Sequence, residues 1–274
     1  MIKEKILLIE DSKALSNILT KKMTGELDFE VIQAYTFEQA REIIDDDDDF
    51  FIALCDLNLP DAPNGEIVDF VISKKIPAIV LTASSDVELQ KSFLKKNIID
   101  YVHKGDLKDI DYIFSVIKRV SNNRDIKVLI VDDSIVARNE LKRLFELYMF
   151  KVLVCAHGEE ALNYLKDNRD IKLILTDYNM PVINGLEFTE KVREEYSKNE
   201  IIIFAMTASN EPRISSRFLK MGANDFIRKP YDREELFLRI NSTIGQKDDF
   251  DKLVKMAKGL IKRDKKFLDE AKII

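Results

Sequence analysis

The sequence is poor in tryptophan, cysteine, histidine, proline and glycine. Among 274 residues there is no Trp, and there are only two Cys, two His, six Pro and eight Gly. Cys55 and Cys155 lie far apart in apolar runs, which excludes a disulfide framework or a Cys-based metal site and suits a reducing compartment. No apolar run approaches the length of a signal-peptide core or a membrane helix. We therefore expect a cytoplasmic protein that does not enter a membrane.

Charge and length narrow the possibilities further. Lys and Arg total 43 against 49 Asp and Glu, a formal net charge of −6, which disfavours direct binding to nucleic acid. Apolar residues make up 46% of the chain, which is enough to build buried cores. At about 150 residues per domain, the length predicts two domains.

An internal repeat gives those two domains a common origin. Residues 5–12 read KILLIEDS and residues 127–134 read KVLIVDDS. Further matches follow at nearly constant offsets, and small insertions fall between them, as expected if the variation lies in loops. The matched pairs are Asp56 with Asp177, Asn58 with Asn179, Asn64-Gly65 with Asn184-Gly185, Thr82-Ala83 with Thr207-Ala208, and Lys104 with Lys229.

Each copy alternates short apolar runs with amphipathic stretches of helical period. This pattern is typical of a parallel sheet covered by helices on both faces. In the second copy the predicted strands are 128–131, 152–154, 171–175, 201–205 and 226–227. The sequence therefore predicts an α/β protein with two five-stranded parallel sheets in tandem.

Breaks in the apolar pattern set the expected domain limits. Ser121 to Asp125 interrupts the helical period and predicts a short linker. The composition changes again after Gln246. We expect a first domain over 1–121, a second over 126–246, and an amphipathic helix over 247–274.

Polar side chains stand at the carboxyl ends of the predicted strands in both copies. Those ends form the ligand-binding edge of an open parallel sheet, so the side chains should converge there. In the first copy they are Glu10, Asp11, Asp56, Thr82 and Lys104, and in the second they are Asp132, Asp133, Asp177, Thr207 and Lys229.

Three carboxylates at one edge repel each other unless a cation joins them. Mg²⁺ fits, because it prefers oxygen ligands and is usually held by one or two carboxylates together with phosphate oxygens. With the charge neutralised, Asp56 or Asp177 can attack a phosphoryl donor and form an aspartyl phosphate. Lys104 or Lys229 can then pair with one phosphate oxygen, and Thr82 or Thr207 can donate to another.

On these residues, both copies resemble receiver domains of two-component response regulators, over about 120 residues each. The resemblance implies a flavodoxin-like fold and Mg²⁺-dependent phosphorylation of Asp177 and Asp56. It implies that Asp133 and Asp11 bind the metal directly, that Asp132 and Glu10 support it through water, and that Asn179 and Asn58 offer backbone carbonyls. Phe226 and Tyr101, three residues before each Lys, would be switch aromatics.

The second copy fits the family pattern throughout, including Lys229-Pro230, where a cis bond is expected. The first copy departs in detail. It has Glu10 in place of the first Asp, lacks a Pro after Lys104, carries Asp61-Ala62-Pro63 in the loop after the acceptor, and is five residues shorter between Gly65 and Thr82. We expect its third helix to be short.

The last 28 residues carry a net charge of +3. Their apolar residues recur every seven positions, at Leu253, Leu260, Phe267 and Ile274, with Phe250, Ala257, Asp264 and Ala271 on the adjoining heptad position. This predicts a long helix that either pairs as a coiled coil or packs on a receiver domain. The sequence stops without a helix cap, so we expect the helix to lead to an effector domain.

Several functions remain open on this sequence. The first is a phosphoacceptor in a phosphorelay, served by a histidine kinase or phosphotransfer protein, whose phosphorylation changes homodimerisation or effector contact. The chain also resembles the regulatory half of a two-receiver diguanylate cyclase, although it has no GGDEF-like motif and is itself no cyclase. A relay in which one domain drains phosphate from the other is a third reading.

A phosphatase of the haloacid-dehalogenase type also combines a nucleophilic Asp with Mg²⁺, a Thr and a Lys. There, the residue two after the nucleophile is an acid. Here Asn58 and Asn179 stand at that position, which disfavours the phosphatase.

Overall fold

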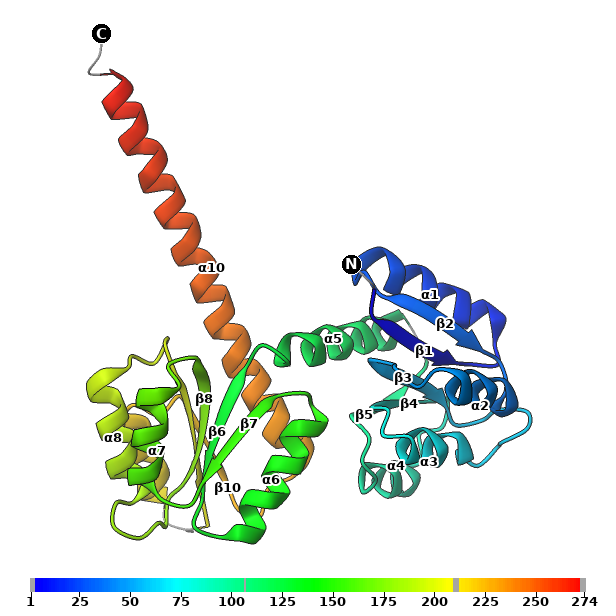
Figure 1. Cartoon of the computed structure of the whole chain (residues 1–274), viewed down its shortest axis with the longest axis horizontal. Coiled ribbons are helices and arrows are strands. Elements are labelled where there is room, and N and C mark those ends of the chain that lie inside the picture. The colour runs from blue at the N-terminus through cyan, green and yellow to red at the C-terminus, as the bar shows by residue number, and fades with distance from the viewer. Residues whose placement is uncertain (1–2, 106, 209–211, 272–274) are drawn as a thin grey trace. The chain divides into compact units, whose positions relative to one another are not determined.

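The computed structural model of the chain describes residues 3–105, 107–208 and 212–271. The chain forms two compact units: residues 1–124 with Leu147–Met149, and residues 125–146 with residues 150–274. Each unit contains a five-stranded sheet flanked by helices (Figure 1). The predicted fold class, two parallel α/β sheets in tandem, is confirmed.

The first unit alternates strands and helices without interruption, in the sheet order β2-β1-β3-β4-β5 with all pairs parallel. Its elements are β1 (Lys5–Ile9), α1 (Lys13–Glu26), β2 (Glu30–Ala34), α2 (Phe37–Asp46), β3 (Ile52–Asp56), α3 (Glu66–Ser73), β4 (Ala78–Thr82), α4 (Val87–Leu94), β5 (Asp100–His103) and α5 (Leu107–Asn123).

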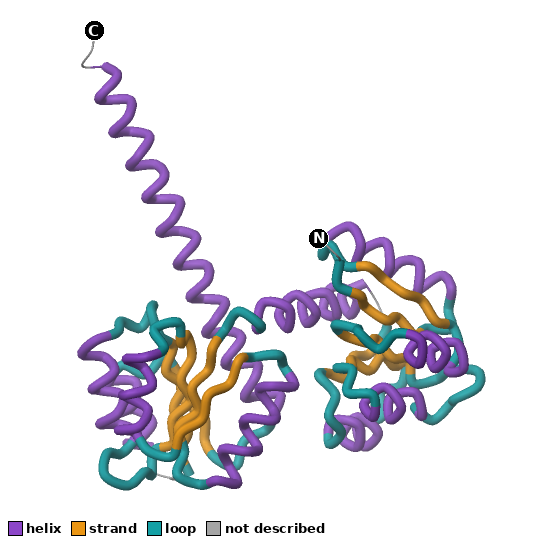
Figure 2. Tube along the Cα trace, in the orientation of Figure 1, coloured by secondary structure: helices purple, strands orange, loops and turns teal. Residues whose placement is uncertain are grey.

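The second unit repeats this order as β7-β6-β8-β9-β10, again with parallel pairs. In Figure 2 the strands of each unit, in orange, are flanked by helices, in purple. The elements of the second unit are β6 (Lys127–Val131), α6 (Ile135–Leu147), β7 (Lys151–Cys155), α7 (Gly158–Asp167), β8 (Ile171–Asp177), α8 (Gly185–Glu195), β9 (Ile202–Thr207), α9 (Pro212–Met221), β10 (Asp225–Arg228) and α10 (Arg233–Ala271). All five strands predicted for the second copy are present, and α3 is shorter than α8, as expected.

Alternation along the strands explains why both faces of each sheet are covered. In β1, Leu7 and Ile9 belong to the core under α2 to α4, whereas Ile6 and Leu8 belong to the core under α1 and α5. All four are fully buried, because successive side chains of a strand point to opposite faces. Strands buried on both faces leave only their ends free to hold polar groups.

The predicted linker between the domains differs in part from the structure. The linker predicted at Ser121 to Asp125 is wrong in its first part, because α5 continues to Asn123. The burial of Ile113, Ile117 and Val120 extends its apolar face to that end, so only a short turn precedes β6. Helix α10 passes Gln246 without a break, so the second unit's last helix and the predicted terminal helix form one element.

Exposure of the apolar side chains changes along the part of α10 whose side chains the structure describes, which ends at residue 258. Leu236, Phe237 and Ile240 are buried, whereas Phe250, Leu253 and Met256 are largely exposed. Of the predicted heptad positions, Ile274 lies outside the described residues, and the side chains of Leu260, Asp264, Phe267 and Ala271 lie outside the described part of α10. Within the described ranges, no helix combines the length and apolar character that a membrane crossing requires.

Candidate functional site

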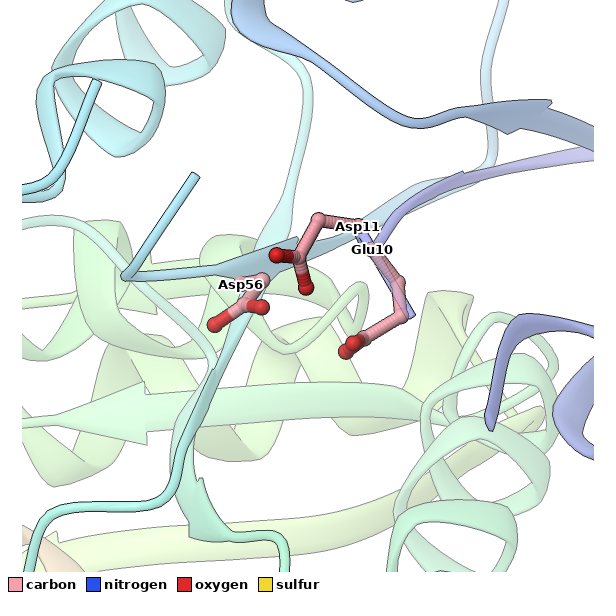
Figure 3. Close-up of side chains that lie close together, drawn as sticks. All are labelled: Glu10, Asp11 and Asp56. Atoms are coloured by element: carbon pink, nitrogen blue, oxygen red, sulfur yellow. The ribbon is translucent and has the colours of Figure 1, made fainter. Parts of the chain in front are cut away.

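In the first unit, three carboxylates meet where β1 and β3 end. Ile9 pairs with Cys55 in the sheet, so the next residues, Glu10 and Asp56, lie beside each other. One oxygen from each of Glu10, Asp11 and Asp56 lies within 4.8 Å of the others, and Figure 3 shows the three side chains gathered at this edge. Glu10 and Asp56 are buried, and Asp11 is exposed. The predicted convergence of these acids is present in the structure.

Lys104 brings the positive charge to this cluster. The backbone N–H of Lys104 donates to the Thr82 carbonyl oxygen at 2.7 Å, which extends the pairing of β5 with β4 by one residue. The Nζ atom then lies 2.5 Å from Asp56 Oδ2 and 2.9 Å from Glu10 Oε2. One ammonium group therefore bridges two buried carboxylates.

The second unit repeats the arrangement with its own residues. Lys229 Nζ lies 2.5 Å from Asp177 Oδ1 and 2.6 Å from Asp132 Oδ2, and its backbone N–H donates to Thr207. The Lys229-Pro230 bond is cis, as predicted. Asp133 is exposed, and within the described residues it does not come as close to Asp132 and Asp177 as Asp11 does to its neighbours.

Burial shifts the pKa of the acidic and basic groups at both sites. It raises the pKa of Asp177, and Lys229 opposes the rise only in part. It likewise raises the pKa of Glu10 against the effect of Lys104, with Asp56 adding to the rise. For Lys104 and Lys229, burial disfavours the charge, but hydrogen bonds to the carboxylates outweigh it and raise the pKa. Both sites are thus crowded with acid groups whose charge costs free energy, which is the setting in which a divalent cation binds.

Backbone amides fix the direction of the acceptor carboxylates. Asn58 N donates to Asp56 Oδ1 at 3.1 Å, and Asn179 N donates to Asp177 Oδ2 at 2.7 Å. The side chains of Asn58 and Asn179 are exposed. The role of their backbone carbonyls toward a metal stays a prediction.

The predicted switch residues lie beside the site on the neighbouring strands. Thr82 and Thr207 end β4 and β9 and are fully buried. Tyr101 is buried with its ring 6.1 Å from that of Phe93, and its hydroxyl has no hydrogen-bond partner among the described residues. Phe226 is half-buried. Next to Tyr101 is a pocket of about 340 Å³ lined by Ser84, Ser85, Asp86, Gln90, Tyr101 and His103.

The sequence showed Gly185 only as an anchor of the repeat, and the structure shows why glycine is needed there. A Cβ atom on Gly185 would lie 2.2 Å from the carbonyl oxygen of Asp177. Helix α8 can therefore begin against the backbone of the acceptor residue only because this side chain is absent. Gly65 has the matching position and a φ of 76°, and its Cβ would lie 2.7 Å from Leu57 Cδ2.

The comparisons with known proteins agree with this geometry. Residues 128–241 match the family model of the response regulator receiver domain. The chemotaxis protein CheY homolog of Campylobacter jejuni is 36% identical over 121 residues, 44% of this chain and 93% of that protein. The chemotaxis protein CheY1 of Helicobacter pylori is 36% identical over 124 residues, 45% of this chain and 100% of that protein.

Two solved structures described as two-component system response regulator/GGDEF domain proteins are similar over most of the chain. One has a TM-score of 0.80 and 33% identity, and the other has 0.79 and 34%; each likeness covers 90% of this chain and 100% of the solved chain. The chain therefore belongs to the response regulator receiver family. Receiver domains of this family are non-catalytic phosphoacceptors that interact with histidine kinases and phosphotransfer proteins.

Proposed function

We propose that both domains accept a phosphoryl group with the help of Mg²⁺, on Asp177 and on Asp56. The observation that carries the proposal is the duplicated bridge of one lysine between two buried carboxylates, at the carboxyl ends of parallel strands. The proposed donor is a histidine kinase or a phosphotransfer protein, and the proposed compartment is the cytoplasm.

The proposed metal ligands are oxygen-bearing residues at the carboxyl ends of the strands in each domain. In the second domain, Asp133, Asp177 and the carbonyl of Asn179 would hold Mg²⁺, with Asp132 acting through water. In the first domain the direct ligands would be Asp11, Asp56 and the carbonyl of Asn58. Glu10 would act through water. The donors are all oxygens, as Mg²⁺ prefers, and the ion would supply charge neutralisation for the incoming phosphoryl group.

The protein's own groups account for the transfer. A carboxylate oxygen of Asp177 forms the new bond to phosphorus while the bond from phosphorus to the donor nitrogen breaks, and the electron pair of that bond leaves with the donor imidazole. Lys229 then exchanges its contact with the Asp177 carboxylate for one with a phosphoryl oxygen, and the Thr207 hydroxyl donates to another. In the first domain Asp56, Lys104 and Thr82 act in the same way.

The output surface is proposed to lie on α4, β5 and α5 in the first domain and on α9, β10 and α10 in the second. There, movement of Thr82 or Thr207 toward the phosphoryl group would let Tyr101 or Phe226 turn inward. The exposed apolar residues of α10 support homodimerisation through residues 247–274. The likeness to response regulator/GGDEF domain proteins supports a second reading, in which the chain is the regulatory part of a diguanylate cyclase.

Intact-mass measurement tests the proposal. With acetyl phosphate and Mg²⁺, the wild-type chain should gain up to two phosphoryl groups, Asp56→Asn and Asp177→Asn one each, and the double variant none. An adduct that survives in the double variant, or the absence of any Mg²⁺-dependent adduct on the wild type, would overturn it. The lifetimes of the phosphate in the two single variants also distinguish a phosphate sink, which predicts one short-lived site.

A further inference from the structure

A carboxylate outside the acidic cluster links the first site to helix α2. Asp61 lies in the loop between β3 and α3, and its two oxygens accept hydrogen bonds from the first two amides of α2, Phe37 N at 2.8 Å and Glu38 N at 3.0 Å. The next amide, Gln39 N, donates to Thr36 Oγ1 at 3.2 Å. Asp61 therefore accepts hydrogen bonds from the two amides at the start of α2 that the Thr36 side chain does not cap.

The interaction is electrostatic as well as geometric. The amino end of a helix carries partial positive charge, so a carboxylate is favoured there. Partial desolvation of Asp61 opposes its charge, yet the hydrogen bonds from Phe37 and Glu38 outweigh this and lower its pKa. Asp61 is thus held as an anion on α2 although its side chain reaches solvent.

The loop between β3 and α3 connects Asp61 to the phosphorylation site. Leu59 and Ala62 form an antiparallel bridge, with Ala62 N donating to the Leu59 carbonyl oxygen at 3.2 Å. The side chains of Leu57, Leu59 and Ala62 are buried. Only three positions before Asp61, the amide of Asn58 holds the Asp56 carboxylate. Asp61 and Asn58 therefore belong to one short, closely packed loop.

The second domain fastens the same loop differently. Its loop is one residue shorter between acceptor and glycine, and Ile183 packs against the start of α7, where a Cβ on Gly158 would lie 2.7 Å from Ile183 Cγ1. The N-cap residue His157 makes no side-chain cap hydrogen bond. An apolar contact thus stands where the first domain uses a charged one.

We infer that Asp61 is a positioning residue for the first site: by capping α2 it holds the loop that presents Asn58 and Asp56 to Mg²⁺ and the phosphoryl donor. The inference rests on the proposed function of Asp56. It concerns the first domain alone, because the second domain has no such carboxylate in its loop. The loss of a residue that orients a metal ligand typically weakens metal binding by about tenfold or more.

The test measures how the rate of Asp56 phosphorylation by acetyl phosphate depends on Mg²⁺ concentration, in the full chain carrying Asp177→Asn. Asp61→Ala should raise the half-saturating Mg²⁺ concentration by about tenfold. Asp61→Asn, which keeps one acceptor oxygen, should recover part of that loss. The matched control is Asp48→Ala, which removes the same charge from the exposed segment after α2.

The outcomes separate the two claims. If the parent chain is phosphorylated at Asp56 and both Asp61 variants keep its Mg²⁺ dependence, the inference is overturned while the proposed function stands. If the parent chain is not phosphorylated at Asp56, the proposed function fails at this site and the inference fails with it. If Asp61→Ala unfolds the domain, the Asp61→Asn variant alone decides: an unchanged half-saturating concentration contradicts the positioning role.

Discussion

Lys229 Nζ lies 2.5 Å from Asp177 Oδ1 and extends the same ammonium group to Asp132. The first domain reproduces this with Lys104 between Asp56 and Glu10. If the lysine is removed, the buried carboxylates still bear the free-energy cost of desolvation but have no positive charge beside them. The lysine therefore stabilises the fold as well as the site. The contribution of the buried lysine to stability can be distinguished from that of an exposed lysine by comparing two substitutions.

We predict that Lys229→Met lowers the free energy of unfolding by about 2 kcal/mol at neutral pH without Mg²⁺. Lys252→Met is the control, because its ion pair with Asp249 is exposed on α10 and should contribute less than about 0.5 kcal/mol. Urea unfolding followed by far-UV circular dichroism measures both. Equal losses in the two variants would show that the buried bridge has no special part in stability.

The acidic sites give stability a defined pH dependence. Burial raises the pKa of Asp177 and Glu10 above their ordinary values of 3.8 and 4.5, so the folded chain holds these protons more tightly than the unfolded chain. Without Mg²⁺, their contribution favours the fold below those ordinary values and is lost as pH rises through the raised pKa. Mg²⁺ binds the ionised form, so its effect has the opposite sign.

We therefore predict that the rise in Tm caused by Mg²⁺ is small near about pH 4 and grows toward about pH 7. At about ten times its Kd, a ligand stabilises by about 1.4 kcal/mol, which thermal unfolding detects. The Asp56→Asn, Asp177→Asn double variant should show a much weaker response. A Tm shift that is the same at both pH values in the wild type would contradict a raised pKa for Asp177 and Glu10.

Gly185 offers a steric test of the second site. A Cβ there would overlap the carbonyl oxygen of Asp177, so Gly185→Ala should destabilise the chain by about 2 kcal/mol and slow phosphorylation of Asp177 but not of Asp56. Gly245→Ala is the control, because nothing lies within 4 Å of a Cβ in that helix position, and it should be neutral or stabilising. Thermal unfolding and site-resolved mass spectrometry give the two readouts. Normal labelling of Asp177 in Gly185→Ala would refute the steric argument.

Most of the fold was predictable because its signals are local and duplicated. Apolar runs such as Val128–Val131, alternating with amphipathic stretches, indicate strands buried on both faces. The repeat located the acidic pair, the acceptor, the Thr and the Lys at strand ends. The parallel register then brings these ends together without further information.

Long-range contacts were not predictable in the same way. Asp61 stands between Pro60 and Ala62 in a segment that looks like a turn, and its partners Phe37 and Glu38 lie more than 20 residues away. The change in composition after Gln246 does not mark a helix end, and α10 runs through it. The distance of Asp133 from its neighbours depends on side-chain torsions that no sequence pattern reports.

The reactivity of the two cysteines reports whether the core of each domain is closed to solvent. Cys55 precedes Asp56, but alternation along β3 turns its side chain into the core shared with α2 and α3. Burial raises the pKa of Cys55, and it raises that of Cys155 to about 12. We predict that iodoacetamide at mildly alkaline pH modifies neither thiol in the native chain and both in urea. Rapid native alkylation at Cys55, read by peptide mass, would show that the core beside the first site is open.

The central claim is that Asp177 and Asp56 form Mg²⁺-dependent acyl phosphates, and chemical trapping tests it most directly. Borohydride reduces an aspartyl phosphate to homoserine, so peptide mapping after acetyl phosphate treatment locates the modified residues. The structure predicts homoserine at positions 177 and 56 when Mg²⁺ is present, and at neither position when a chelator removes it. Homoserine at other carboxylates, or trapping at these two that does not depend on Mg²⁺, would contradict the account.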